Sequence, residues 1–98
     1  MEAKEVQIIK NAVHRHFGMN SAVFLFGSRT DDDKRGGDVD LLIESELNDE
    51  DAFRARIEVM TDIQLRMGDQ KIDIVVTKPG EKDERAVVIN ARNEGIAL

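Results

Sequence analysis

The stretch LFGSRTDDDKRGGDVDLLIE, residues 25–44, joins two short apolar runs through a polar segment that contains carboxylates, glycines and basic side chains. Residues 22–26, AVFLF, form a continuous apolar run that ends at Gly27, which predicts a buried strand. Residues 38–43, DVDLLI, alternate so that apolar side chains share one face, which predicts a second strand. The polar segment between them is either a solvated turn or a site that holds metal and phosphate.

Outside this stretch the sequence predicts three helices and one further strand. Apolar spacings of three and four predict a helix over residues 3–17, while Asn48 and Gly68 are typical of the start and the end of a second helix. Residues 71–77, KIDIVVT, predict a third strand, and a last helix is expected over about residues 83–93. This order predicts an α/β (α+β) class with a small mixed three-stranded sheet and helices packed on it. In the second helix, helical spacing is followed by Phe53, Ile57, Met60, Gln64 and Met67.

Length and composition narrow the class of protein. The chain has 98 residues, no cysteine and a formal net charge of −6, so we expect a single domain over residues 1–98 and no disulfide framework. The acidic balance argues against nucleic-acid binding by this chain alone, because such binding needs clustered Lys and Arg. The sequence has no apolar run of about 18 residues and no signal-peptide pattern, so we expect no membrane contact and a cytoplasmic location.

Three carboxylates stand out on the predicted strands. Side chains alternate along a strand, so Asp38 and Asp40 share one face and can flank one hard cation. Asp73 interrupts an apolar run on the third strand, where an unpaired carboxylate is costly to bury. If the second and third strands are neighbours, the three carboxylates cluster, and a divalent cation relieves their repulsion. The simpler alternatives are a solvated strand edge for the first two and, for Asp73, a surface salt bridge to Lys71.

The polar segment begins with a possible phosphate site, Gly27-Ser28-Arg29, directly after a buried strand. Gly27 lets the backbone turn sharply and lets a phosphate approach its N–H groups. Ser28 adds a hydroxyl donor, and Arg29 adds a fork of donors suited to phosphate oxygens. A strand followed by Gly-Ser is also typical of a plain turn, and residues 34–37, KRGG, are also typical of a flexible basic loop.

The residues of this segment do not match several other phosphate-binding or metal-binding motifs. No Gly-Lys-Ser/Thr follows the glycine, which excludes a Walker-type phosphate loop. An EF-hand starting at Asp31 would have Arg35 and Leu42 where Asp or Asn and Glu are needed. A phosphatase of the haloacid dehalogenase type places its Asp-x-Asp after an apolar strand, whereas here the apolar residues follow the aspartates. His14 and His16 are two apart on a helix, so they diverge, and we expect surface residues and not metal ligands.

The spacing of these elements resembles a known signature. Gly27-Ser28, nine residues and then Asp38-Val39-Asp40 before an apolar run resemble the pattern of the DNA polymerase β-like nucleotidyltransferase superfamily. Asp73 resembles that superfamily's third carboxylate. The sequence LFGSR…GGDVDLL and the short length of the chain are most similar to those of the minimal nucleotidyltransferases (MNT proteins). These proteins are often the antitoxin partners of HEPN-domain toxins. The resemblance covers about residues 5–90.

The resemblance implies a nucleotidyltransferase fold and a role for each matching residue. The metal ligands and catalytic residues that it implies, for two Mg²⁺ ions, are Asp38, Asp40 and Asp73. The residues that it implies for binding the nucleoside triphosphate are Gly27, Ser28, Arg29 and Arg35. Many minimal members continue after Gly-Ser-Arg with Ala-Arg-Gly, whereas this chain has Thr30-Asp31-Asp32-Asp33. Arg35 would then replace the missing second arginine.

The implied activity is Mg²⁺-dependent transfer of a nucleoside monophosphate, AMP from ATP, to a hydroxyl of a partner protein, a HEPN toxin that the antitoxin thereby neutralises. One alternative is a binding antitoxin that blocks its partner by contact, with the catalytic site unused. Others are a small-molecule nucleotidyltransferase, which usually has an additional acceptor domain, and an acidic domain without catalysis. Residues 96–98 either contribute to the partner surface or fold back on the core. The acceptor, the nucleotide and the homo- or hetero-oligomeric state stay open.

Overall fold

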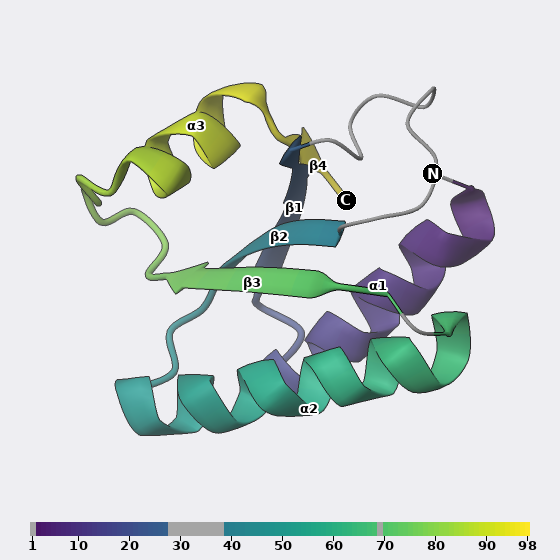
Figure 1. The fold of residues 1–98 in the computed structure, drawn as a ribbon. Helices are drawn as coiled ribbons and strands as arrows, with labels where there is room; N and C mark the ends of the chain where they lie inside the picture. The colour runs from purple at the N-terminus through teal and green to yellow at the C-terminus, as the bar shows by residue number, and fades with distance from the viewer. Residues whose placement is uncertain (1, 28–38, 69) are drawn as a thin grey trace.

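The computed structural model describes residues 2–27, 39–68 and 70–98. The elements along the chain are α1 (Ala3–Phe17), β1 (Ala22–Phe26), β2 (Val39–Glu44), α2 (Asp49–Met67), β3 (Ile72–Thr77), α3 (Ala86–Glu94) and β4 (Ile96–Ala97), as Figure 1 shows. The predicted α/β class and the order of the first six elements are confirmed. None of the helices in these described ranges is long and apolar enough to cross a membrane.

The sheet is mixed, with the strand order β3-β2-β1-β4. β2 pairs in parallel with β3, and β1 pairs antiparallel with both β2 and β4. The sheet therefore has one strand more than the three predicted, because the C-terminal residues fold back and pair with β1. Gly95 permits this return, since a Cβ there would overlap the carbonyl oxygen of Ala91 and lie 3.1 Å from that of Leu25. The chain can thus pass from α3 directly into the sheet.

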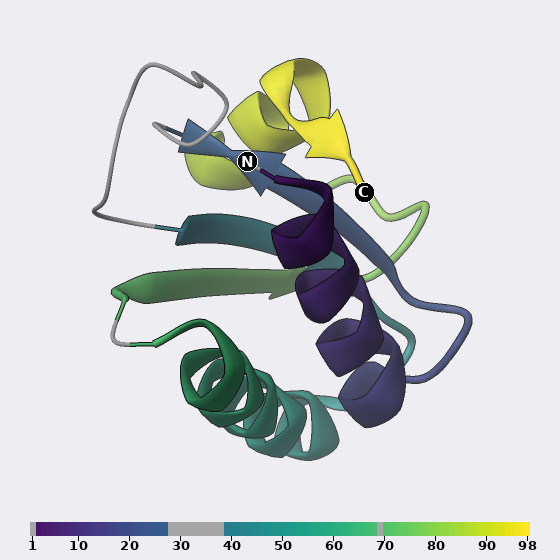
Figure 2. The ribbon, with the colours of Figure 1, turned by 90° about the vertical axis from the view of Figure 1, so that its right-hand side faces the viewer.

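Helices cover both faces of the sheet, with α1 and α2 on one face and α3 on the other (Figures 1 and 2). The larger core lies between the sheet and the first two helices. Its residues from the strands are Val23, Leu25, Val39, Leu41, Ile43, Ile72 and Ile74. On the other face Leu42 is fully buried against Val88 and Ala91 of α3. Because side chains alternate along each strand, the same strands contribute apolar residues to the cores on both faces of the sheet.

The residues that follow helical spacing in the sequence of α2 are not the ones that this helix buries most deeply, although Met60 and Met67 among them pack against the core. Phe53 is 57% exposed and Ile57 is 47% exposed. The residues that α2 buries are Ala52, Ala55, Val59 and Ile63. Ala52 and Ala55 have small side chains, which let α2 lie close to the elements packed against it. Larger side chains would not fit there, because protein interiors are close-packed. The predicted ends are confirmed: the Asn48 side chain accepts a hydrogen bond from the Asp51 N–H at 2.8 Å, and Gly68 caps the other end.

An ion cluster joins α1 to α2 around Asp62, whose side chain is 11% exposed. Arg15 donates to Asp62, Arg66 Nε donates to it at 2.7 Å, and His16 Nε2 lies 3.0 Å from it. Burial raises the pKa of Asp62, but hydrogen bonds to Arg66, His16 and Arg15 outweigh it and hold this pKa below its ordinary value. His16, expected to be a plain surface residue, is thus part of the contact between the helices.

We expect Asp62→Asn to lower the free energy of unfolding by about 1–3 kcal/mol, because it removes the charge that three neighbours share. Because the pKa of Asp62 is lowered in the folded state, its contribution is complete above the ordinary value of 3.8 and is lost as the pH falls below that value. Urea unfolding of both proteins between about pH 6 and about pH 3 measures this difference.

The matched control is Glu50→Gln, because Glu50 is 85% exposed and pairs with Arg54 at 3.8 Å. Its effect should stay within about 0.5 kcal/mol. A wild-type to Asp62→Asn difference that stays constant across the acid range would contradict the role given to the carboxylate.

Candidate active site

Two of the predicted catalytic carboxylates lie side by side on the sheet. In the parallel pair, Asp40 of β2 is the register partner of Asp73 of β3. In the antiparallel pair, Asp40 is also the partner of Phe26, the last residue of β1. Cross-strand partners point to the same face of a sheet, so these three side chains form one row across three strands. We call Asp73, Asp40 and Phe26 the site row.

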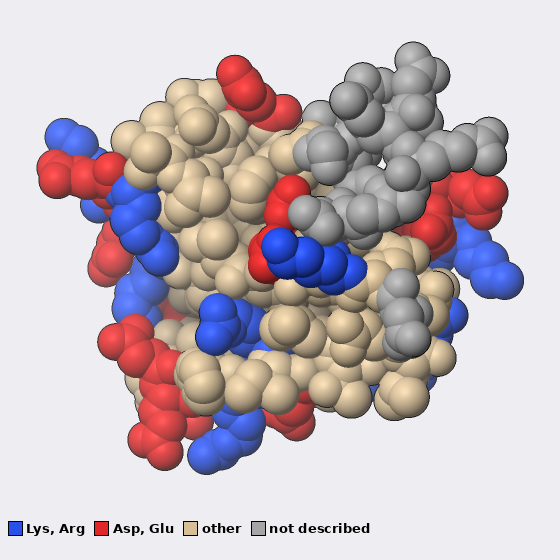
Figure 3. All heavy atoms as spheres, in the orientation of Figure 1, with Lys and Arg blue, Asp and Glu red and all other residues tan. Residues whose placement is uncertain are grey.

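The site row runs from Phe26, which packs beside α3, to Asp73, which this helix leaves open. One step further along the strands, Leu42 is the partner of both Val75 and Phe24 and is buried beneath α3. In the site row, by contrast, the Asp73 side chain is 53% exposed. Figure 3, which views the molecule from the β3 side, shows acidic and basic side chains gathered near its centre, above β3 as it runs in Figure 1. The Asp73 carboxylate is therefore open to a ligand that approaches from solvent, and the half-buried Asp40 lies beside it.

Arg92 holds α3 in the position that leaves the Asp73 end of the site row open. Its guanidinium donates to Glu44 at 3.1 Å, at the far end of β2 from Asp40. It also donates to the carbonyl oxygens of Lys78 and Glu81, in the connection between β3 and α3. This one side chain therefore ties the helix, the connection and the sheet together.

A second set of contacts fixes the start of α3. Asp83 accepts hydrogen bonds from Arg85 and from the Thr77 hydroxyl, the latter at 2.8 Å. These bonds, those of Arg85 first, hold the pKa of Asp83 well below its usual range. Arg85 also donates to the Val76 carbonyl oxygen at 2.9 Å. The end of β3 and the start of α3 are thus joined by side chains that are already paired.

Gly27 lies against the Asp40 carboxylate. Its φ is +76°, in the region that favours glycine. A Cβ built on Gly27 would overlap Asp40 Oδ2 and lie 3.1 Å from Asp40 Cγ. The absence of a side chain at Gly27 therefore lets the carboxylate lie where it does, next to the turn that the sequence predicted to bind phosphate.

The salt bridge considered as the simpler explanation of Asp73 is present. Lys71 Nζ lies 4.0 Å from Asp73 Oδ2, and both side chains are more than half exposed. An exposed pair at this separation contributes little stability, about 0–1 kcal/mol. It does not remove the oddity of two adjacent carboxylates, which repel each other directly across the strands. The pair and a cation site are compatible, because Lys71 offsets part of that repulsion.

Of the predicted site residues, the structure brings together Gly27, Asp40 and Asp73. The remaining ones, which lie outside the described residues, are Ser28, Arg29, Arg35 and Asp38. Within residues 2–27, 39–68 and 70–98, no three His, Asp or Glu side chains converge to hold a metal ion. The two adjacent carboxylates still supply the hard oxygen ligands that Mg²⁺ requires, and Mg²⁺ often takes only one or two carboxylates from a protein. The donor set therefore fits this cation.

Two residues that shape the site, one beside it and one at the other end of β2, were missed from the sequence. Phe26 was assigned only to a buried strand, although its position directly before Gly27 was a signal that it would lie beside the site. Arg92 was assigned to the last helix without a role. Its partner Glu44 is 48 residues away in the sequence, so no local pattern could show the contact.

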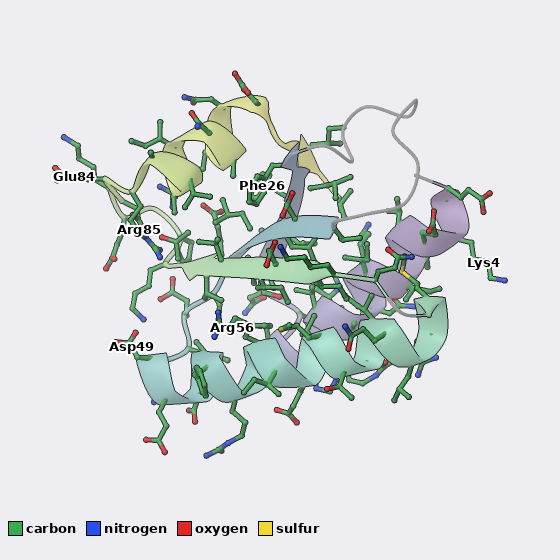
Figure 4. The ribbon with its side chains drawn as sticks, in the orientation of Figure 1. Lys4, Phe26, Asp49, Arg56, Glu84 and Arg85 are labelled. Atoms are coloured by element: carbon green, nitrogen blue, oxygen red, sulfur yellow. The ribbon has the colours of Figure 1, made fainter. Side chains whose placement is uncertain are left out.

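A separate cavity of about 480 Å³ lies at the other end of β3, beside the start of α2. Asp49 and Arg56 of α2 and Arg85 line it, and Figure 4 labels all three. The Arg56 guanidinium lies 5.3 Å from the centre of the Phe53 ring. Neither carboxylate of the site row lines this cavity, so we do not include it in the candidate active site.

A comparison with protein-family models finds a match over most of the chain. A family model described as a nucleotidyltransferase domain matches residues 6–98. The match includes all four strands and therefore the whole site row. A comparison with curated proteins finds no matching sequence. The match bears on the superfamily, while the antitoxin role and the HEPN partner stay predictions.

We expect Gly27→Ala to weaken binding of Mg²⁺ by about 10–100-fold, the usual effect of disturbing a group that positions a metal ligand. The new Cβ would push the Asp40 carboxylate aside. Calorimetric titration with Mg²⁺ measures the effect, and denaturant unfolding should show a loss of at least about 1–2 kcal/mol from backbone strain.

Gly80→Ala provides the control, because Gly80 has a φ of +74° but a Cβ added there would have no heavy atom within 4 Å. It should lose similar stability through strain and keep its affinity for Mg²⁺. Equal affinity in both variants would mean that Gly27 does not position Asp40.

Proposed function

The chain belongs to the nucleotidyltransferase domain family, and on that premise we propose that it transfers AMP from ATP, with Mg²⁺, to a hydroxyl of a partner protein. The observation that carries the proposal is the register of β2 and β3, which places Asp40 directly beside Asp73 on the open part of the sheet. Gly27 adjoins the same carboxylate. The carboxylate pair could bind the cation, and the glycine backbone beside it leaves room for the triphosphate that the cation accompanies.

The residues that would hold Mg²⁺ are Asp40 and Asp73, together with Asp38. When bound, Mg²⁺ would supply charge neutralisation at the phosphoryl oxygens and at the leaving group. The backbone N–H of Gly27 and the residues that follow it would orient the triphosphate. The reaction would need no covalent enzyme intermediate, so the absence of cysteine is no obstacle.

In the proposed reaction the acceptor oxygen forms a bond to the α-phosphorus. The bond from that phosphorus to the bridging oxygen breaks, and pyrophosphate leaves with the electron pair. Asp73 would accept the proton of the attacking hydroxyl, because its side chain is half exposed and lies on the outermost strand of the pair. Positioning of the two reactants would supply much of the rate.

The acceptor that we propose, following the resemblance, is a tyrosyl hydroxyl on a HEPN toxin. The chain itself contains no tyrosine, so it cannot be its own tyrosyl acceptor. The C-terminal residues do not lie beside Asp73, because β4 and β3 are the opposite edges of the sheet. The partner surface would therefore be built on the β3 side, without the C-terminal tail.

A binding antitoxin without catalysis is the second candidate. The observation that favours it is a set of exposed apolar side chains on α2, namely Phe53, Ile57 and Leu65, the last of which is 82% exposed. Exposed apolar side chains that share one element can mark a contact surface. This candidate makes no use of the site row, so substitution of a carboxylate separates the two candidates.

We expect Asp40→Asn to reduce transfer by about a thousandfold, because charge stabilisation by a bound metal is worth several kcal/mol. The chain and the product of the neighbouring gene are co-expressed, and the intact mass of that product is measured. The expected result is a mass increase of one or more nucleoside monophosphates with the wild type and none with Asp40→Asn.

Glu46→Gln is the control, because this exposed carboxylate follows the other end of β2. It should leave the mass increase unchanged. Neutralisation of the toxin without a mass change, undiminished by Asp40→Asn, would contradict the transferase proposal and support the binding antitoxin.

We expect Asp73→Asn to slow transfer more than it weakens ATP binding, because Asp73 lies on the strand next to the proposed acceptor side. Calorimetric affinity for ATP with Mg²⁺ and the rate of transfer are measured on the same preparation. If both collapse to the same extent, Asp73 builds the nucleotide site and does not act on the acceptor.

A further inference from the structure

A cavity of about 250 Å³ opens beside Gly27, on the β1 side of the site row. It lies between the end of β1 and α3, and its lining residues are Phe26, Gly27, Val87, Asn90 and Glu94. Figure 4 shows Phe26 in the space between α3 and the sheet. The cavity therefore adjoins the predicted phosphate turn and uses side chains that the proposed reaction has not assigned.

The lining combines an aromatic ring with two kinds of polar group. Val87, Asn90 and Glu94 recur at spacings of three and four, so they share one face of α3. Phe26 faces them from the strand and is partly buried against the cluster of Leu42, Val88 and Ala91. An aromatic face with an amide and a carboxylate nearby is the chemistry that recognises a nucleoside.

We propose that this cavity holds the adenosine of the bound triphosphate, an inference that rests on the proposed nucleotidyl transfer. The base stacks on Phe26. The Asn90 amide donates to N7 of adenine and accepts from its N6 amino group, and Glu94 accepts a hydrogen bond from a ribose hydroxyl. Val87 supplies apolar contact. The phosphates then pass Gly27 toward Asp40.

Adenine is the base that the amide suits. The N7/N6 edge of adenine offers one acceptor and one donor, which a single amide can satisfy together. The corresponding edge of guanine offers two acceptors, which suit the donors of Arg or Lys instead. The side chains that α3 presents to the cavity include no Arg or Lys, among the residues that the structure describes. The cavity should therefore prefer ATP to GTP.

The order of the site row gives the bound nucleotide a direction. Phe26, Asp40 and Asp73 follow one another across β1, β2 and β3. A nucleoside on the Phe26 side leaves the Asp73 side free for the acceptor. The same geometry thus separates the two substrates, with the carboxylates between them.

The test compares the wild type with Asn90→Ala and with Asn93→Ala, a control on the same helix whose side chain does not line the cavity. Alanine favours helix, so both variants should fold, which circular dichroism checks. Calorimetry measures the affinity for ATP, GTP and inorganic tripolyphosphate, each with Mg²⁺. Asn90→Ala should weaken the binding of ATP about tenfold and abolish the preference for ATP over GTP. It should leave the affinity for tripolyphosphate unchanged. Asn93→Ala should behave as the wild type.

A second variant, Glu94→Gln, tests the ribose contact. The wild type should bind ATP more tightly than 2′,3′-dideoxy-ATP, and Glu94→Gln should narrow that difference, whereas Glu84→Gln, at an exposed position before α3, should not.

The outcomes separate the inference from the function on which it rests. If Asn90→Ala leaves the affinities for ATP and tripolyphosphate unchanged, or weakens both equally, the adenosine site is overturned. Nucleotidyl transfer would still stand. Failure of the wild type to bind either compound would overturn both.

Discussion

The register between β2 and β3 is the constraint on which the rest of the structure depends. It places Asp40 beside Asp73, two like charges about 4.8 Å apart at the level of the backbone. Such a pair is unfavourable unless something offsets it. The same register buries Leu41 and Ile74 on the other face of the sheet. A slip of β3 by one residue would turn Asp73 into the core and Ile74 out of it, so core packing holds the two charges together.

This constraint explains why the site lies at an edge of the covered face. Lys71 offsets part of the charge from solvent, and a cation with charge 2+ would offset more. α3 cannot move over the carboxylates without burying them, and Arg92 fastens it to Glu44 at the other end of β2. The open end is thus a consequence of the fold: one end of β2 and β3 supports α3, and the other end presents a carboxylate on each strand.

Much of this arrangement could be predicted from the sequence because it is local. The apolar runs indicated the strands, Asn48 and Gly68 marked the ends of α2, and the odd position of Asp73 in an apolar run singled it out as a candidate site residue. From the sequence, the pairing of β2 with β3 could only be assumed, because tertiary packing decides which strands become neighbours. The structure supplies it, and with it the contact between two carboxylates from separate strands.

The failures were at places where long-range packing decides. Phe53 and Ile57 follow helical spacing, yet α2 buries Ala52 and Ala55 instead, since the closeness of the neighbouring layer favours small residues there. The fourth strand depends on the close approach of Gly95 to β1, which the sequence does not reveal. The most direct measurement of the central claim is an Mn²⁺ titration followed by amide NMR, because Mn²⁺ accepts the same carboxylate ligands as Mg²⁺. The account predicts selective broadening at Asp40 and its strand partner Asp73. Broadening centred on the acidic first turn of α2, or spread without selectivity, would contradict it.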